Sequence, residues 1–286
     1  MSRDAVLLLG GGGFIGRALT RRLQLEGIPV HVVGRENLAS LDRLLPLCGT
    51  VVHLASATTP GSSARHPELE TGNLALTLQL LELLQTQPPT HLVFFSSGGT
   101  VYGNPATFPV TEACPIAPLS HHGAGKAAQE ILCRTLSTQG HAVTVLRPSN
   151  AYGPGQNLRQ GFGLIRTMLE HARASTTLDI WGDGENVRDY IYIDDVVEAT
   201  VRFVGLPDDA GTYNLGSGVG YSINRVKNMV ERVCGAKLNT ACRPSRDVDV
   251  RGVVLDNTRL ETRLNWVPSV GLEEGIEYTW KDLKHP

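Results

Sequence analysis

The chain has 286 residues, with 26 Lys and Arg against 28 Asp and Glu, so its formal net charge is −2. This balance excludes the strongly basic surface of proteins that bind nucleic acid or anionic membranes. Hydrophobic residues make up 41% of the chain and charged residues 19%, which excludes a disordered chain and allows a buried core. The five cysteines form no CxxC pair and the first residues do not have the pattern of a signal peptide. We therefore expect a cytoplasmic protein without disulfides, a metal site or a membrane span.

The first half of the chain alternates short apolar segments with helical patterns. Runs such as AVLLL at 5–9 contain no polar residue, which is typical of strands buried on both faces of a parallel sheet. The alternation predicts a Rossmann-type doubly wound α/β fold, with a dinucleotide-binding domain at residues 1–150. The predicted strands lie at 5–9, 30–33, 51–54, 91–96 and 142–147, and the predicted helices at 14–26, 38–45, 74–84 and 125–136.

The second half has a different texture. Gly, Pro and Asn cluster at 148–155, which predicts a loop. Beyond it we expect a smaller α/β lobe at 151–286 that binds the substrate, with one strand or helix returning to the first sheet. Its predicted helices lie near 162–171, 194–204, 223–233 and 272–280, and its predicted strands at 178–181 and 189–193.

A glycine-rich loop at 10–16 lies between the first predicted strand and the first predicted helix. Glycines allow a tight turn and let the backbone approach a pyrophosphate, which then lies at the helix N-terminus. The loop therefore predicts a dinucleotide site. The residues expected to contact the cofactor here are Gly10, Gly13, Phe14, Ile15 and Gly16.

The end of the second predicted strand bears on the choice between NAD and NADP. An acidic residue about 20 positions after the glycines binds the ribose 2′-hydroxyl of NAD, whereas an arginine favours the 2′-phosphate of NADP. Gly34 and Arg35 occupy this place, which favours NADP(H). The alternative is that Arg35 is a solvated loop residue and that Glu36 binds the hydroxyl of NAD.

Several segments together resemble the extended short-chain dehydrogenase/reductases, specifically the nucleotide-sugar 4-epimerase and dehydratase group. They follow the family's order over nearly the whole chain. The resemblance implies a dinucleotide cofactor, a nucleotide-diphosphate sugar (UDP at the family level) as substrate, and a homodimer formed through the helices near 72–86 and 125–138. The segments are GGGGFIG (10–16), VVHLAS (51–56), FFSSGGTVYG (94–103), RPSNAYGPGQ (147–156), WGDGENVRDYIYIDDV (181–196), YNLGSG (213–218) and LNWVPSVGLEEGI (264–276).

The resemblance also assigns roles to single residues. Lys126 matches the lysine that holds the nicotinamide ribose and lowers the pKa of the catalytic base. Further positions expected at the cofactor are Leu54, Ala55, Asn73 and Ser96, and those expected at the sugar diphosphate are Asn150, Arg188, Arg246 and Asp249. Two arginines can neutralise the diphosphate with charge-assisted hydrogen bonds.

Two departures from the family pattern fall on the chemistry. The family's Y-x-x-x-K motif places both side chains on one helix face, but His122 stands at the tyrosine position four residues before Lys126. The family's other active-site hydroxyl, a Ser or Thr, is replaced by Gly98, while Thr100 lies two residues further on. Histidine titrates near neutral pH, so His122 can serve as the acid/base group; the alternative is a polar loop residue in an impaired site. Thr100 is the candidate for the missing hydroxyl.

A third departure is the short connection at 36–50 between Arg35 and the third predicted strand. Relatives fit another strand there, which contacts the adenine; this chain is expected to lack it. Three functions stay open: a 4-epimerase with a retained dinucleotide, an NADPH-dependent reductase of a 4-keto nucleotide sugar, and a catalytically impaired dinucleotide-binding protein. The resemblance favours the epimerase, and Arg35 with the missing strand favours the reductase.

Overall fold

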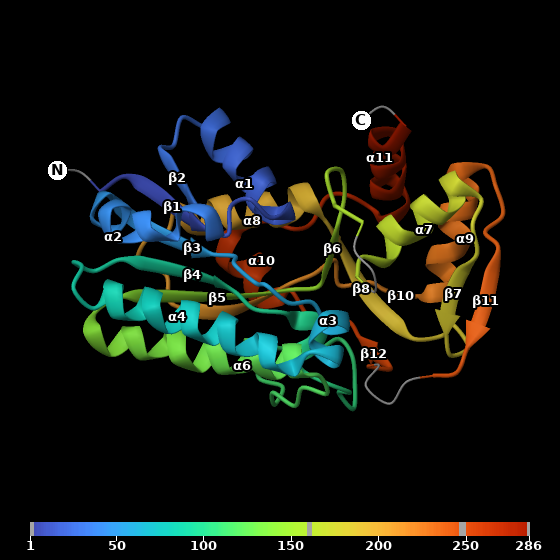
Figure 1. Cartoon of the computed structure of the whole chain (residues 1–286), viewed down its shortest axis with the longest axis horizontal. Helices are drawn as coiled ribbons and strands as arrows, with labels where there is room; N and C mark the ends of the chain where they lie inside the picture. Colours follow the sequence, from blue (N-terminus) through green and yellow to red (C-terminus); the bar gives the residue numbers. More distant parts are fainter. Residues whose placement is uncertain (1–2, 159–161, 246–249, 285–286) are drawn as a thin grey trace.

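The computed structural model describes residues 3–158, 162–245 and 250–284, and it consists of a large lobe around a parallel sheet and a smaller second lobe (Figure 1). Within these ranges no helix has the length and apolarity needed to cross a membrane.

The large lobe is built on a six-stranded sheet in the order β2-β1-β3-β4-β5-β9, in which every neighbouring pair is parallel. This is the predicted doubly wound α/β fold. Successive side chains point to opposite faces, so Leu7 and Leu8 enter two separate hydrophobic cores. The strands are β1 (Ala5–Leu9), β2 (Val30–Val33), β3 (Cys48–His53), β4 (His91–Phe95), β5 (Ala142–Pro148) and β9 (Gly211–Leu215).

Helices cover both faces of this sheet. On one face lie α1 (Phe14–Leu25) and α8 (Ile193–Val204), and on the other lie α4 (Glu70–Leu84) and α6 (His121–Arg134) (Figure 1). Strand β9 and helix α8 follow residue 150 in the chain, yet both belong to the large lobe. The remaining short helices of this lobe are η1 (Arg35–Ser40), α2 (Leu41–Leu44), η2 (Leu45–Leu47), α3 (Pro60–Arg65), η3 (Pro67–Leu69), α5 (Gly98–Val101) and η4 (Thr135–Gln139).

The second lobe contains two small sheets. Strand β8 (Val187–Tyr192) pairs with three others, and a separate parallel pair lies at the far end of the lobe. The partners of β8 are β6 (Asn150–Tyr152), β10 (Gly220–Ser222) and β12 (Gly252–Val253). The separate pair is β7 (Leu178–Trp181) with β11 (Thr240–Arg243). Apart from α8, the helices of the C-terminal half are α7 (Leu164–Ala174), α9 (Ile223–Cys234), α10 (Thr258–Leu264) and α11 (Leu272–Lys284).

The short connection after Arg35 contains no strand. Residues 35–47 form the consecutive turns of η1, α2 and η2, and β2 is the edge strand of the sheet. The expectation that this chain lacks the extra strand is therefore met, and β2 ends the sheet on this side.

Helix α6 begins at His121 rather than at the predicted residue 125. Ser120 caps it, because its hydroxyl accepts a hydrogen bond from the backbone N–H of Gly123 at 3.1 Å. Glycine is required in this first turn, since a Cβ on Gly123 would lie 2.7 Å from the carbonyl oxygen of Thr100. Packing against α5 thus overrides the low helix propensity of the glycines and brings His122 into the helix.

Candidate functional site

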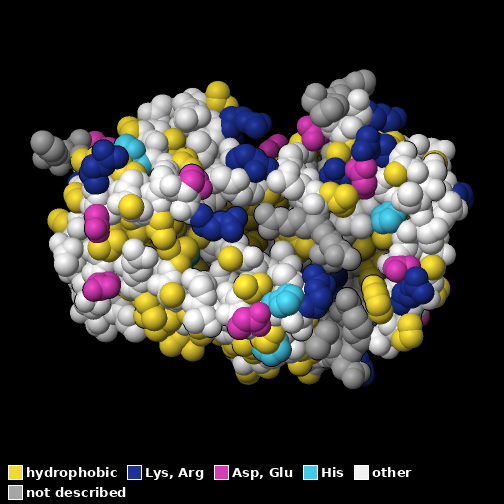
Figure 2. All heavy atoms as spheres, viewed as in Figure 1, with side chains coloured by type: hydrophobic (Ala, Val, Ile, Leu, Met, Phe, Trp, Pro, Cys, Tyr) yellow, Lys and Arg dark blue, Asp and Glu magenta, His cyan; other side chains and the backbone are white. Residues whose placement is uncertain are grey.

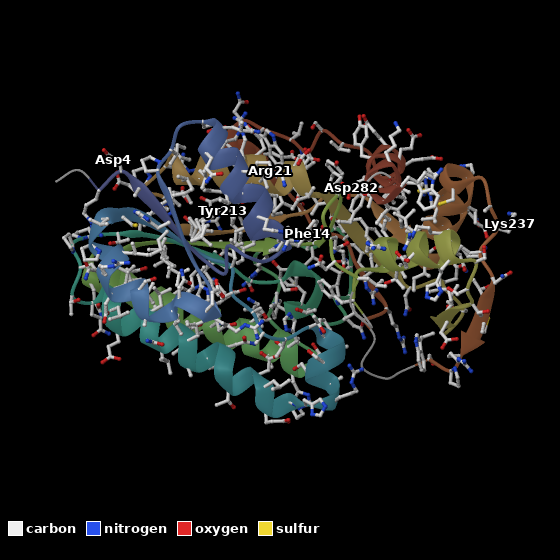
Figure 3. All side chains as sticks on the ribbon, turned by 45° about the horizontal axis from the view of Figure 1, so that its top comes forward. Asp4, Phe14, Arg21, Tyr213, Lys237 and Asp282 are labelled. Carbon is white, nitrogen blue, oxygen red and sulfur yellow. The ribbon has the colours of Figure 1, made fainter. Side chains whose placement is uncertain are left out.

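The glycine-rich loop forms a close-packed turn at the carboxyl end of β1. Gly10 has φ +93°, and a Cβ there would lie 2.6 Å from the backbone N of Ala55, at the end of the neighbouring strand. A Cβ on Gly16 would lie 2.5 Å from the Cα of Gly11. Gly13 precedes α1 in an extended conformation and has no side chain to cap the helix. The first N–H groups of α1 therefore lie where a pyrophosphate can accept them, and Figure 3 shows Phe14 at this end of the helix, facing the second lobe.

A carboxylate lies against Gly34 at the end of β2. The side chain of Glu36 folds back so that a Cβ on Gly34 would collide with its carboxylate oxygens. The backbone N–H of Gly34 donates to Asn37 Oδ1 at 2.7 Å, which fixes the turn. Arg35 is exposed. Glu36 is also exposed, and its carboxylate is the charged group that lies against Gly34, which is the alternative considered from the sequence.

Among the other residues expected at the cofactor, Ala55 lies against the glycine loop and Leu54 precedes it, with its N–H bonded to Leu9 at 2.8 Å. Asn73 fixes the loop after β3, because its Oδ1 accepts the N–H of Ala57 at 2.8 Å. Ser96 has a different role: its hydroxyl donates to Glu130 in the protein interior. This hydrogen bond ties the residue after β4 to helix α6.

The buried group around Glu130 gives the stretch after β4 a structural role. Arg147 donates two hydrogen bonds to the Glu130 carboxylate, at 2.9 Å and 2.7 Å, and a third to the Tyr102 hydroxyl at 2.8 Å. The Tyr102 hydroxyl in turn donates to Asn214 Oδ1 at 2.6 Å. This network ties α6, β5 and β9 together beneath the site.

His122 and Lys126 lie one turn apart on α6, and both are buried, with 8% and 5% of their surface exposed. Lys126 Nζ donates to the carbonyl oxygen of Phe95 at 2.9 Å. Burial lowers the pKa of Lys126 to about 8, against the opposing effect of the nearby carboxylates. Burial, and then the charge of Lys126, lower the pKa of His122 to about 4, so the imidazole is neutral at physiological pH.

Two residues that the sequence did not single out contact His122. Its Nδ1 lies 3.1 Å from the Thr58 hydroxyl and 3.5 Å from Glu70 Oε1. Glu70 lies three residues before Asn73 on α4, and Asn73 Nδ2 donates to Glu70 Oε2 at 2.8 Å. From the sequence, the i, i+3 spacing shows only that Glu70 and Asn73 share one face of a helix. The packing of α4 on α6 brings Glu70 to His122.

The place of the family hydroxyl at position 98 is filled by an apolar side chain. A Cβ on Gly98 would lie 2.6 Å from Leu255 Cδ1 and 2.7 Å from the carbonyl oxygen of Arg147. Thr100 lies in the same short helix, and its buried hydroxyl has no hydrogen-bond partner among the residues that the structure describes. Its carbonyl packs against the first turn of α6, so Thr100 lies beside the segment that carries His122.

Asn150 and Arg188 lie on neighbouring strands of the second lobe. Asn150 Nδ2 donates to the carbonyl oxygen of Asp189 at 2.8 Å, and it would lie 3.7 Å from a Cβ on Gly99. The structure therefore brings Asn150 beside α5, at the junction of the two lobes. Lys and Arg side chains gather around this junction on the face drawn in Figure 2. The predicted residues Arg246 and Asp249 lie outside the described ranges.

Comparison with known proteins gives a consistent result. The model of the NAD dependent epimerase/dehydratase family matches residues 6–216. The UDP-glucose 4-epimerase of Mycolicibacterium smegmatis is 32% identical over 304 residues, which covers 96% of each chain. A UDP-glucose 4-epimerase of Thermotoga maritima, solved with UDP-glucose, superimposes with a TM-score of 0.90 at 30% identity and 98% coverage of both chains. That of Thermus thermophilus, solved with NAD, gives a TM-score of 0.90 at 29% identity, with 98% of this chain and 99% of the other covered.

Proposed function

Because the chain belongs to the NAD dependent epimerase/dehydratase family, we propose that it is a nucleotide-sugar 4-epimerase acting by hydride transfer at C4 of the sugar. The observation that carries this proposal is the pairing of the glycine loop with a buried neutral histidine and a buried lysine, one helical turn apart on α6.

The residues at the carboxyl ends of β1 and β3 fit a dinucleotide. Side chains at Gly10 or Gly16 would fill the turn, so the glycines keep the backbone open for a pyrophosphate at the start of α1. Lys126 is proposed to hold a ribose hydroxyl, as the family resemblance implies. When bound, the oxidised dinucleotide supplies the hydride acceptor.

His122 is the proposed acid/base group. A neutral imidazole accepts the proton of the C4 hydroxyl at its free ring nitrogen and returns the proton to the same oxygen to complete the cycle. Burial, and then the cation of Lys126, lower the pKa of His122 to about 4, which keeps the imidazole unprotonated at neutral pH but also makes it a weak base. Thr100 is proposed to bind the sugar oxygen, because its hydroxyl has no partner among the described residues and Gly98 and Leu255 leave no room for a hydroxyl at position 98.

The cofactor is proposed to be NAD. The carboxylate of Glu36 against Gly34 is the type of group that accepts a hydrogen bond from the ribose 2′-hydroxyl and repels a 2′-phosphate. The solved epimerase of Thermus thermophilus carries NAD. The preference for NADP(H) based on Arg35 stays a prediction, and titration with both dinucleotides decides between them.

The substrate is proposed to be a UDP-sugar. Asn150 at the lobe junction and Arg188 on the adjacent strand β8 provide an amide and a cation for its diphosphate, together with Arg246 and Asp249 as the resemblance implies. The Thermotoga maritima relative was solved with UDP-glucose. With a net charge of −2 the chain has no overall attraction for a dianionic ligand, so the proposal relies on these local arginines.

The alternative function is an NADPH-dependent reductase of a 4-keto nucleotide sugar. The edge position of β2 supports it, because a sheet without the extra strand leaves fewer contacts for the adenine and favours an exchangeable cofactor. Exposed Arg35 also supports it.

We further propose a cytoplasmic homodimer. All five cysteines are free, which suits a reducing compartment. The helices α4 and α6 pack side by side, and Leu78 and Ile131 are 50% and 65% exposed on them. Sedimentation velocity of the wild type and of Ile131→Glu tests this: the wild type is expected to be a dimer and the variant a monomer, and a monomeric wild type contradicts it.

Cofactor retention separates the epimerase from its alternatives. The purified protein is denatured and the released small molecules are chromatographed. About one NAD per chain supports the epimerase; an empty protein that reduces 4-keto sugars with NADPH supports the reductase. An empty protein that binds dinucleotide but turns over neither class of sugar contradicts both.

A further inference from the structure

Glu70 is a buried carboxylate with one oxygen left unpartnered. Only 8% of its surface is exposed. Its Oε2 accepts a hydrogen bond from Asn73, but its Oε1 has no hydrogen-bond partner within the described part of the chain. The ring nitrogen Nδ1 of His122 lies 3.5 Å from this oxygen. A buried charged oxygen needs a donor, and beside Asn73 the polar groups near this carboxylate are the imidazole of His122 and the hydroxyls of Thr58 and Ser63.

The protons of the surrounding side chains can be assigned from a backbone contact. The N–H of Ala57 can only donate, so the atom of Asn73 that it contacts is the carbonyl Oδ1. The amide Nδ2 of Asn73 therefore donates both to Glu70 Oε2 and to the Thr58 hydroxyl, at 2.8 Å and 2.9 Å.

The Thr58 hydroxyl has a single proton, and two acceptors compete for it. One is the carboxylate of Glu70 and the other is Nδ1 of His122, at 3.1 Å. A carboxylate is the stronger acceptor, because charge-assisted hydrogen bonds are about twice as strong as neutral ones. The carboxylate oxygen 3.5 Å from Nδ1 likewise favours a ring that presents an N–H to it rather than a lone pair, so we expect Nδ1 to carry the proton and the Thr58 oxygen to accept it.

A glycine in α6 makes room for this contact. A Cβ on Gly125 would lie 2.7 Å from Glu70 Oε2. Gly125 lies between His122 and Lys126 in the sequence, so the Glu70 carboxylate contacts α6 close to both of these residues. The charged groups that face His122 are Glu70 from α4 and Lys126 from its own helix.

We propose that Glu70 is a positioning residue that holds the Nδ1 proton of His122 and thereby leaves Nε2 as the nitrogen that exchanges a proton with the substrate. The carboxylate fixes the tautomer and orientation of the ring and stabilises the imidazolium that forms when Nε2 accepts a proton, while the positive charge of Lys126 opposes that imidazolium. The inference deepens the proposed role of His122 and rests on it.

The test is the tautomer of His122 in the free protein. Long-range ¹H–¹⁵N correlation spectra of ¹⁵N-histidine-labelled protein at pH 7 distinguish Nδ1–H from Nε2–H, and the signals of His122 are identified by their loss in His122→Phe. The wild type is expected to show Nδ1–H. In Glu70→Met, the Thr58 proton is free to go to Nδ1, so the spectrum is expected to change to Nε2–H.

A second variant displaces the carboxylate without removing it. Gly125→Ala places a methyl group against Glu70 and is expected to weaken or invert the Nδ1–H signature. Matched controls are Glu68→Met, two residues away in an exposed contact with His66, and Gly72→Ala, where a Cβ meets nothing within 4 Å. Neither control is expected to change the signals of His122.

An Nε2–H tautomer in the wild type, or an unchanged Nδ1–H tautomer in Glu70→Met, overturns the inference. In the active enzyme, Glu70→Met is expected to lower kcat about tenfold or more with little change in dinucleotide affinity. The acid limb of the pH profile is expected to stay in place or move to lower pH, because the negative charge that favours the imidazolium is gone. The spectra need no turnover, so this inference and the proposed function can fail separately.

Discussion

The space at position 98 gives a direct test of how the site is built. Gly98→Ser restores the hydroxyl of the family pattern, but its Cβ would lie 2.6 Å from Leu255 Cδ1 and 2.7 Å from the carbonyl oxygen of Arg147. Leu255 is completely buried, and the carbonyl belongs to β5, which is paired with a strand on each side, so neither can move freely. Overpacking of this kind typically costs about 1–3 kcal/mol, so the melting temperature is expected to fall by roughly 2–12 °C.

The matched control is Gly99→Ser in the same short helix, where a Cβ would meet nothing closer than 3.7 Å. Its stability is expected to stay within about 0.5 kcal/mol of the wild type, as for most substitutions without a clash. Urea unfolding measures both variants. The double variant Gly98→Ser with Leu255→Ala is expected to lose less unfolding free energy than the two single variants lose together, because the serine then occupies space that the leucine leaves. A Gly98→Ser protein as stable as the wild type refutes the reasoning.

Four further variants address the ligands and the core. His122→Phe is expected to abolish turnover while fluorescence titration shows unchanged dinucleotide binding; retained turnover assigns the proton chemistry to another group. Arg188→Ala is expected to weaken UDP-sugar binding by about 1.5–3 kcal/mol in calorimetry, the range for hydrogen bonds to charged groups, and no loss would remove it from the site. Glu36→Gln is expected to lower the ratio of NAD to NADP affinity by about tenfold, and an unchanged ratio contradicts the proposed role of its carboxylate. Arg147→Met removes the buried partner of the Glu130 carboxylate and is expected to cost about 3–5 kcal/mol of unfolding free energy. Arg134→Met removes a half-exposed arginine 3.7 Å from the same carboxylate and should cost far less. Equal losses would refute the claim that the buried arginine matters more for stability.

The sequence was most informative where the constraint is local. The glycines at 10, 13 and 16 lie in one turn, so their spacing alone predicts how closely the backbone packs there. The missing strand was also predictable, because residues 36–50 are too few for another crossover and strand. The alternating apolar segments predict the parallel sheet for the same reason, since each strand carries its own pattern.

The contacts that decide the chemistry depend on packing between distant segments. Glu70 and His122 come from α4 and α6, and no periodicity connects them. Leu255, far from Gly98 in the sequence, fills the space beside it. The sequence therefore shows only that the family hydroxyl is missing, whereas the structure shows that a leucine occupies its place. Ser96 was expected at the cofactor, but its hydroxyl is bound to Glu130 in the interior. The direction in which Glu36 folds was equally hidden, because the turn allows the side chain of either Arg35 or Glu36 to lie against Gly34.

The most direct measurement of the central claim is the conversion of UDP-glucose carrying deuterium at C4, followed by NMR without added dinucleotide. A 4-epimerase with a retained cofactor is expected to produce the C4 epimer with the deuterium still at C4, and His122→Phe is expected to produce none. Loss of the deuterium to solvent, or no epimer from any of a panel of UDP-sugars by a protein that carries NAD, would contradict hydride transfer at C4 as the function of this chain.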